Sequence, residues 1–403
     1  MQIKIYRGTH QIGGCVTEIF TKQARIIIDM GAELPQAGKT TQSQLAIDGI
    51  TQGAPRCDAV FITHYHGDHV GMTQTVLPSI PIYMGQAAKQ IYGTVQQTLQ
   101  TKLGTGNASI VDNFKTFQAG KPIYIKDICV TPFCIDHSAF DAYMFLIEAE
   151  GKRILHTGDF RMHGARGRKM PTVFKRYAES VDVLIIEGTM MSRLQEEVVS
   201  EHDLGKKATQ ILRQNQNVFV LVSSTNVDTI AEFYKAAIAT RKPFVVCDDY
   251  QRQILQIVTA NSKSSFYNFD RQKVYVYGNN LHSFLAMRGF CFVGRANYAT
   301  QKALESFPQN VLVYSMWQGY LNAAHPAYDE YKAQFVQNAV SKGSKYQYLH
   351  TSGHASAQQI KQVCQLTHAK FIIPIHSENP ENFTKLGISG KLCLLSDGES
   401  FLV

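Results

Sequence analysis

Short apolar runs separated by turns dominate the first 190 residues of the chain. The runs are QIKIY, RIIIDMG, AVFITH, IYIKDICVTPF, YMFLIEA, RILHTGD and VDVLIIEGT. Their length and their β-branched residues predict strands. A longer amphipathic segment at 86–103 predicts a helix, with shorter helices near 69–78 and 172–179. Gly151 and Lys152, between two of the runs, predict a hairpin turn. Antiparallel sheets with helices on their outer faces fit this pattern.

From about residue 195 the pattern changes to strands that alternate with helices. Helices are expected at 200–214, at 226–239 after Asn226 or Asp228 as a cap, and from about 249, with strands at NVFVLVS, FVVCDD and VLVYS. Such alternation is typical of a parallel α/β sheet. After a helix at about 328–341, short strands and loops return. The pattern therefore predicts a domain at 196–345 inserted into another one formed by 1–195 and 346–403.

The composition is that of a globular protein, with 403 residues of which 44% are hydrophobic and 18% charged. No apolar stretch has the 18 or more residues of a membrane-spanning helix. The N-terminus lacks the segments of a signal peptide and resembles a first strand, so we expect a cytoplasmic location. The eight cysteines form no CxxC pair. They indicate reduced, mostly buried thiols and argue against cysteine as a metal ligand.

The net charge of +8 permits a polyanionic partner without requiring one. Six basic residues and no acidic residue fall in the segment 161–176. They are Arg161, Arg166, Arg168, Lys169, Lys175 and Arg176. A charge run is often only a solvated face, so two interpretations stay open for this segment, a solvated surface and a set of phosphate contacts.

The segment FITHYHGDHVG, residues 61–71, places three histidines and an aspartate within six positions. Alternate residues of an extended chain face the same side, so His64 and His66 can reach one metal ion. A tight turn at Gly67 then presents Asp68 and His69 to a neighbouring point. Imidazole with an occasional carboxylate is the donor set that zinc favours. The segment therefore predicts a metal site rather than an ordinary surface loop.

This segment resembles the HxHxDH signature of the metallo-β-lactamase superfamily. Asp29 in RIIID, His137 in IDHSAF and Asp159 in HTGDF match the superfamily's other motifs. Three more positions resemble motifs A, B and C of its β-CASP branch, the nucleic-acid nucleases that include ribonuclease J. They are Glu187 in LIIEGT, His354 in HTSGHAS and His376 in IIPIHSE. Ribonuclease J proteins usually carry glutamate where this chain has Gly67, and the resemblance leaves the oligomeric state open.

The resemblance implies an α/β (α+β) fold, a four-layer αββα metallo-β-lactamase sandwich with an inserted parallel α/β domain of the β-CASP type. It also implies two zinc ions, with Mn²⁺ or Mg²⁺ as alternatives. The expected ligands are His64, His66 and His137 for the first metal and Asp68, His69 and His376 for the second, with Asp159 bridging both. A metal-bridging hydroxide would then attack phosphorus. Asp29 and Glu187 are expected to accept N–H groups from ligand imidazoles.

Catalytic roles are expected for Asp68, Asp159 and His354. His354 would bind the scissile phosphate or protonate the leaving 3′ oxygen. Ser352 and Gly353 would form a backbone nest for phosphate. Ser356 and Gln359 form a capping-box pattern at the start of a helix. The loop SSTNVDT at 223–229 could bind a phosphate, but a helix cap is the better interpretation.

Three functions are compatible with these residues. The leading prediction is a phosphodiesterase that cleaves RNA, with DNA as an alternative, in a cleft between the two domains. The second is a two-zinc hydrolase of a small ester, thioester, lactam or nucleotide, since this type of fold does not fix the substrate. The third is a non-catalytic RNA-binding scaffold. The inserted domain and motifs A, B and C favour the first.

Overall fold

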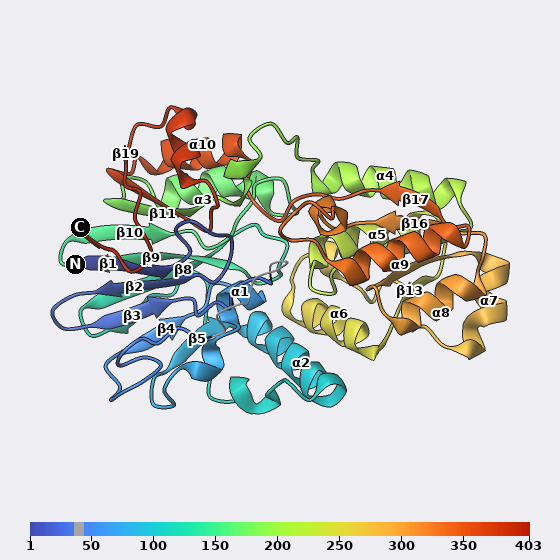
Figure 1. Cartoon of the computed structure of the whole chain (residues 1–403), viewed down its shortest axis with the longest axis horizontal. Coiled ribbons are helices and arrows are strands. Elements are labelled where there is room, and N and C mark those ends of the chain that lie inside the picture. The colour runs from blue at the N-terminus through green and yellow to red at the C-terminus, as the bar shows by residue number, and fades with distance from the viewer. Residues whose placement is uncertain (36–43) are drawn as a thin grey trace. The chain divides into compact units, whose positions relative to one another are not determined.

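The computed structural model describes residues 1–35 and 44–403. The chain forms two compact units (Figure 1). The first contains most of the chain up to Glu197 together with Gly353–Val403, and the second contains Val198–Ser352. The first unit holds two mixed sheets, and the second holds one parallel sheet.

The first sheet has the strand order β20-β1-β2-β3-β4-β5-β6. Its strands are β1 (Gln2–Arg7), β2 (Val16–Phe20), β3 (Arg25–Ile28), β4 (Ala59–Phe61), β5 (Ile82–Gly85), β6 (Lys115–Phe117) and β20 (Ser400–Leu402). β1 lies antiparallel to both β2 and β20, with Gln2 opposite Phe20 and Leu402. β3, β4, β5 and β6 run parallel to one another. Ile3 and Ile5 are fully buried, as the two-residue period of a half-buried strand requires.

The second sheet has the strand order β19-β18-β11-β10-β9-β8-β7. Its strands are β7 (Ile123–Ile125), β8 (Ile128–Cys134), β9 (Tyr143–Ala149), β10 (Lys152–His156), β11 (Val183–Glu187), β18 (Phe371–Ile375) and β19 (Lys391–Leu392). β7 to β10 pair antiparallel, and β10, β11, β18 and β19 run parallel. The hairpin turn before β10 consists of Glu150 and Gly151, both at positive φ, rather than Gly151 and Lys152.

The two sheets pack face to face, and helices cover their outer faces (Figure 1). One apolar cluster joins the inner faces, for example through Ile5 and Phe61 of the first sheet and Phe145 of the second. A second cluster joins the outer face of the second sheet to Phe174 and Ile360. The helices of this unit are α1 (Gly67–Val70), α2 (Gln86–Leu103), α3 (Met170–Tyr177) and α10 (Ala357–Thr367). The unit is therefore the expected four-layer αββα sandwich.

Two local predictions in this unit are confirmed. The helix expected at 86–103 is α2, which spans those residues. Ser356 caps α10, and its side chain accepts a hydrogen bond from the Gln359 backbone while Gln359 reaches back to the Ser356 N–H. This reciprocal pair fixes the start of α10 next to His354.

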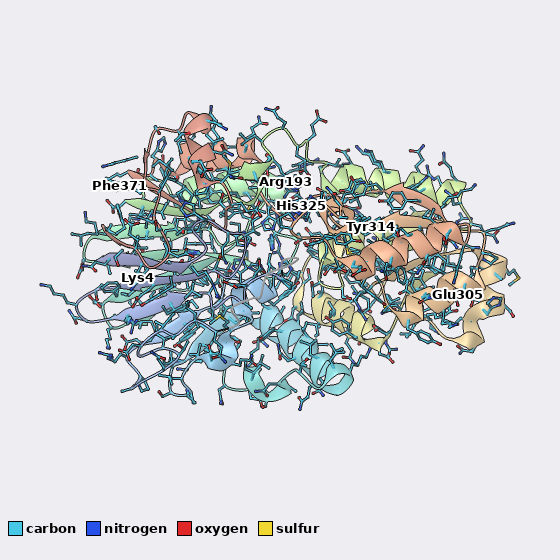
Figure 2. All side chains as sticks on the ribbon, viewed as in Figure 1. Lys4, Arg193, Glu305, Tyr314, His325 and Phe371 are labelled. Atoms are coloured by element: carbon cyan, nitrogen blue, oxygen red, sulfur yellow. The ribbon has the colours of Figure 1, made fainter. Side chains whose placement is uncertain are left out.

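The second unit is a parallel sheet with the order β14-β13-β15-β12-β16-β17. Its strands are β12 (Asn217–Leu221), β13 (Phe244–Val246), β14 (Val274–Val276), β15 (Phe290–Gly294), β16 (Val311–Tyr314) and β17 (Lys345–Tyr348). Its helices are α4 (Glu201–Gln214), α5 (Val227–Ala239), α6 (Asp249–Asn261), α7 (His282–Arg288), α8 (Tyr298–Ser306) and α9 (Glu330–Ser341). The central strands are buried, as in parallel sheets covered on both faces. Tyr314, at the end of β16, is fully buried, and Figure 2 labels it within the second unit.

Two details of the second unit bear on the sequence predictions. Asn226 caps α5 by accepting a hydrogen bond from the Thr229 N–H, which confirms the interpretation of the loop at 223–229 as a helix cap. The predicted insert ends at residue 345, but β17 pairs parallel with β16, so residues 346–348 extend the third sheet instead of the first domain. The boundary depends on which strand β17 pairs with, and the composition of the segment does not predict that pairing.

The remaining short elements are 3-10 turns. They lie at Thr73–Thr75, Ala108–Val111, Gly167–Lys169, Thr189–Ser192, Ser265–Tyr267, Asn279–Leu281, Gln318–Leu321 and Pro380–Leu386. In the described part of the chain, every helix is too short or too polar to cross a lipid bilayer. All eight cysteines carry free thiols, and five of these residues are buried.

Candidate metal centre

The histidine and carboxylate side chains gather at one edge of the sandwich because each follows a strand that ends there. Asp29 follows β3, the segment 63–69 follows β4, and His137, Asp159 and His376 follow β8, β10 and β18. β3 and β4 are parallel, and β8, β10 and β18 share one direction through their pairings with β9 and β11. Asp29 and His376 have φ of 63° and 52°. Such left-handed backbone is uncommon outside glycine and clusters at functional sites.

One group consists of His64, His66 and His137, whose ligand atoms lie within 4.8 Å of one another. His137 donates from Nδ1 to the Gly353 carbonyl at 2.7 Å, so its Nε2 carries a lone pair. That Nε2 lies 3.3 Å from Nδ1 of His66. Burial lowers the pKa of His66 to about 4. Burial also lowers the pKa values of His64 and His137 well below the ordinary value, and neighbouring histidines lower these two pKa values further. Three neutral imidazoles therefore converge, as a metal ion requires.

A second group consists of Asp68, His69, Asp159 and His376, again within 4.8 Å. Nε2 of His69 lies 3.1 Å from Oδ2 of Asp159, and Nε2 of His376 lies 3.1 Å from Oδ2 of Asp68. Oδ2 of Asp159 also lies 3.6 Å from His376 Nε2 and 3.9 Å from Nε2 of His64, which belongs to the first group. Asp159 thus stands between the two groups, at the position expected for a bridging carboxylate.

The electrostatics of the second group favour a bound cation. Burial opposes the ionisation of Asp159, but His376, His69 and His354 outweigh it and hold the pKa of Asp159 well below its ordinary value. Burial likewise opposes the charge of His69, yet Asp159, Asp29 and Asp68 raise the pKa of His69 well above 6.5. Buried carboxylates at this density need positive charge beside them, and a divalent cation supplies it more compactly than a protonated imidazole.

The donor atoms that face the centre fit a metal pair. Nε2 of His64, Nε2 of His69 and Oδ1 of Asp159 are buried and make no hydrogen bond to the residues that the structure describes. Buried polar atoms without a partner are rare in folded proteins, and an absent ion is one of their ordinary explanations. The residues present therefore suit a dinuclear site built from imidazole and carboxylate.

A further layer of hydrogen bonds orients the imidazoles. Asp29 is fully buried and accepts from the Thr63 N–H at 2.7 Å, from the Thr63 hydroxyl at 2.8 Å and from His69 Nδ1 at 2.7 Å. This places the His69 proton on Nδ1 and leaves Nε2 for the centre. The hydroxyl of Thr189 lies 2.8 Å from Nδ1 of His376 and 3.1 Å from Nδ1 of His354.

Glu187 has a different partner from the one expected. Its Oε1 lies 3.2 Å from Nδ1 of His354 and accepts the backbone N–H groups of Phe160 and Ala355. Its Oε2 accepts the Thr189 N–H at 3.0 Å. We expected Glu187 to hold an imidazole of the metal-ligand set, but these contacts direct it to His354. Burial opposes the charge of His354, but Glu187 and Asp159 outweigh it and raise the pKa of His354.

The predicted phosphate-binding residues are brought together only in part. Gly353 offers its carbonyl to His137 and lies so close to Ser138 that a Cβ would meet the Ser138 hydroxyl at 2.8 Å. Ser352 is the last residue of the second unit. The expected nest therefore stays a prediction. In the basic segment 161–176, Arg161 is fully buried, whereas Arg168, Lys169, Lys175 and Arg176 are exposed.

Three residues at the centre were not predicted from the sequence. Thr63 and Thr189 bond the imidazoles or their carboxylate partners, and Cys15 forms a third group with His69 and His376 within 4.8 Å. The sequence does mark both threonines in one way. Each lies two residues after the end of a strand and within two residues of a predicted site residue. Cys15 follows a Gly-Gly pair and directly precedes β2, but its neighbours in the sequence resemble those of a core thiol.

Residues 24–223 match the family model described as the Beta-lactamase superfamily domain. The chain is 22% identical to Ribonuclease J of Helicobacter pylori over 392 residues, which are 92% of this chain and 55% of that protein. It is 23% identical to Ribonuclease J of Mycoplasma pneumoniae, with 94% and 68% covered. The chain thus spans about half the length of the Helicobacter relatives that it matches.

Two further similarities extend over most of the chain. Ribonuclease J of Thermus thermophilus is 22% identical, with 92% of this chain and 67% of that protein covered. A crystal structure of a protein of unknown function from Enterococcus faecalis superposes with a TM-score of 0.76 at 20% identity, covering 100% of this chain and 99% of the other. This last similarity concerns the fold alone.

Proposed function

Because the chain belongs to the metallo-β-lactamase superfamily and is a distant relative of ribonuclease J, a member of its β-CASP branch, we propose that it is a zinc-dependent phosphodiesterase that cleaves RNA. The observation that carries the proposal is the position of Asp159 between two groups of imidazoles. A carboxylate in that place suits two cations that act together on one phosphate.

The ligands are assigned from the geometry above. His64, His66 and His137 would hold one cation, and Asp68, His69 and His376 the other, with Asp159 shared. When bound, such a pair of cations supplies Lewis-acid chemistry, activates water for attack on phosphorus and neutralises charge on the phosphoryl oxygens. Zinc is the cation we assign because imidazole and carboxylate in a compact set suit it.

His354 would complete the reaction as the proton donor. Its Nδ1 faces Glu187 and Thr189, so we assign Nε2 to donate a proton to the leaving 3′ oxygen. Burial opposes the charge of His354, but Glu187 and Asp159 raise its pKa, which favours the protonated ring that a general acid requires. Its side chain is 23% exposed, against 0% for His64 and 0% for His376, so it is more open to a substrate than these two.

RNA is the proposed substrate for two reasons. Three relatives that match over more than nine-tenths of this chain, from Helicobacter pylori, Mycoplasma pneumoniae and Thermus thermophilus, are named Ribonuclease J. The first unit also carries the exposed cations Arg168, Lys169, Lys175 and Arg176 on and just before α3. Cations of this kind bind phosphates without sequence preference and would guide RNA to the centre.

Digestion of a 5′-labelled single-stranded RNA by the zinc-loaded protein tests the proposal. Substrates with a 5′-monophosphate and a 5′-triphosphate are compared, because a dependence on the end would identify exonuclease action. His354→Gln should lower the cleavage rate by about 10²–10⁴-fold, the usual contribution of a general acid, and should retain the metal. His202→Gln, an exposed histidine on α4, is the matched control and should cleave normally.

Two outcomes would overturn the proposal. Intact RNA together with rapid hydrolysis of a small ester, thioester, lactam or phosphodiester would assign the centre to a small substrate. If the purified protein binds no divalent cation and binds RNA without cleaving it, the protein is a non-catalytic RNA-binding scaffold.

A further inference from the structure

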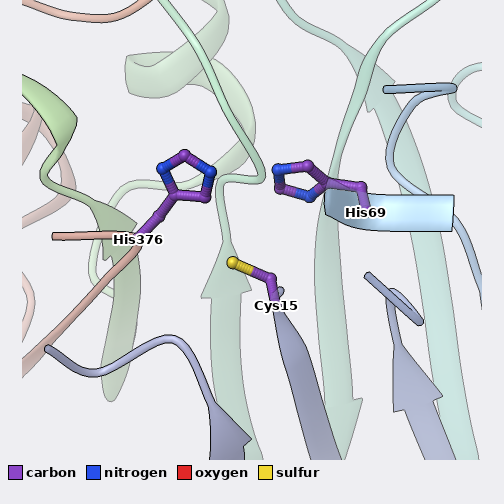
Figure 3. Close-up of side chains that lie close together, drawn as sticks. All are labelled: Cys15, His69 and His376. Carbon is purple, nitrogen blue, oxygen red and sulfur yellow. The ribbon is translucent and has the colours of Figure 1, made fainter. Parts of the chain in front are cut away.

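Cys15 lies beside the second group of candidate ligands. It directly precedes β2 and is 1% exposed. Its sulfur lies within 4.8 Å of a ligand nitrogen of both His69 and His376, and Figure 3 shows it pointing toward the two rings. His69 Nε2, which has no hydrogen-bond partner among the described residues, is a buried donor atom of the same group. A cation placed among these atoms would therefore meet sulfur as well as nitrogen.

The backbone fixes Cys15 to the ligand loop. The Cys15 N–H donates to the carbonyl of Asp68 at 3.1 Å, and the Gly31 N–H donates to the carbonyl of Cys15 at 3.0 Å. Gly8 leaves just enough room, since a Cβ there would meet the Cys15 sulfur at 3.2 Å. The sulfur thus holds a set position relative to Asp68 and His69, as a preorganised metal ligand must.

The surroundings of the Cys15 sulfur are polar and negatively charged. Burial raises the pKa of the thiol well above its ordinary value, and Asp159, Asp29 and Asp68 raise it further. By contrast, the Cys57 sulfur donates to the carbonyls of Arg25 and Ala59. The Cys15 sulfur makes no hydrogen bond to the residues that the structure describes. A dication beside it would neutralise the carboxylates that oppose a thiolate.

We propose that Cys15 is an additional ligand of the second metal position, together with Asp68, His69, Asp159 and His376, and that it selects zinc there over manganese or magnesium. This inference rests on the proposed function in one respect, since both require that the two metal positions exist. Binding exchanges the S–H bond for a bond between sulfur and the cation, and the proton passes to solvent. Thiolate is a soft ligand that favours zinc, whereas carboxylate and water suit manganese and magnesium.

Cobalt substitution of the full-length protein tests the inference by absorption. Wild-type protein with two bound Co²⁺ ions should show a thiolate-to-cobalt charge-transfer band in the near ultraviolet, and Cys15→Ser should lose it while both ions stay bound. Cys57→Ser, a buried thiol of the same unit, is the matched control and should keep the band. The ratio of zinc to manganese affinity should fall by about tenfold or more in Cys15→Ser, as for other changes to the ligand environment.

The absence of the band from the wild type, or its persistence in Cys15→Ser, would overturn the inference. Zinc-edge X-ray absorption of the wild type gives an independent answer if Cys15→Ser does not fold, because sulfur is a distinct neighbour of zinc at about 2.3 Å. RNA digestion is scored separately. If the protein shows the band but does not cleave RNA, Cys15 is a metal ligand and the proposed function is wrong. If the protein cleaves RNA but shows no band, the proposed function holds and Cys15 is not a ligand.

Discussion

Asp29→Asn removes one charge and one acceptor from a fully buried carboxylate that makes three hydrogen bonds. The Asp29 side chain accepts from the Thr63 N–H, the Thr63 hydroxyl and His69 Nδ1, all within 2.8 Å. The backbone is not the difficulty, because asparagine adopts the left-handed conformation at φ 63° as readily as aspartate. The effect must come from the new amide NH₂ group.

Either orientation of that amide conflicts with a donor. With NH₂ toward the Thr63 N–H, two donors face each other. With NH₂ toward His69, the imidazole can accept only if its proton moves to Nε2, the atom that should face the metal. A buried donor without a partner costs about 1–3 kcal/mol, and loss of an outer partner weakens metal binding by about 10–100-fold. That loss corresponds to about 1.4–2.7 kcal/mol at 1.36 kcal/mol per tenfold change.

Competition of the apo-protein with a chromophoric chelator measures this effect. We expect Asp29→Asn to bind one zinc ion with nearly unchanged affinity and the other about 10–100-fold more weakly. Asp58→Asn is the matched control, because Asp58 accepts the Arg25 N–H and pairs with Lys126 without touching an imidazole. Two zinc affinities equal to those of the wild type in Asp29→Asn would refute the idea that Asp29 sets the proton position on His69.

Three other predictions concern stability. In Gly31→Ala the new Cβ would lie 1.8 Å from the carbonyl oxygen of Asp68, so unfolding by urea should show a loss of about 3 kcal/mol. Gly67→Ala should change stability by less than about 0.5 kcal/mol, because among the described residues a Cβ there would meet nothing within 4 Å beyond its chain neighbours and its own helix. An equal loss in Gly31→Ala and Gly67→Ala would contradict the packing argument. Chelation should lower the free energy of unfolding by about 2.7 kcal/mol if the free metal stood at a hundredfold its Kd, and identical unfolding curves with and without chelator would contradict metal binding. Ser356→Ala should lower the free energy of unfolding by about 1 kcal/mol, because it removes the cap of α10. An equal loss on replacing an exposed, non-capping serine with alanine would contradict this explanation.

The sequence predicted best what depends on neighbouring residues. The helix at 86–103, the capping box and the cap at Asn226 all follow from local patterns, and the structure has each of them. The group at 64–69 was equally visible, since alternate residues of an extended segment face one side. The other members of the centre were reached through family motifs, because Asp68 and His376 are 308 positions apart and no local pattern links them.

What the sequence did not predict depends on contacts made only in three dimensions. Thr189 bonds two imidazoles because β11 and β18 end side by side, and nothing in LIIEGT indicates that pairing. The hydrogen bonds of Glu187 to His354 depend on the same arrangement. Cys15 has the sequence environment of an ordinary core thiol, and only the bond of its backbone to Asp68 brings it to the centre.

Because β1 pairs with β20, the first unit can be redesigned by circular permutation as one uninterrupted polypeptide. The Val403 N–H donates to the Met1 carbonyl at 3.1 Å, so a two-residue linker could join these ends as a hairpin. A permuted chain that runs from 353 to 403 and then from 1 to 197 would carry His354, His376 and every other candidate ligand in one stretch. In that permutein one uninterrupted polypeptide would supply the metal centre, so metal binding could be measured on the first unit by itself.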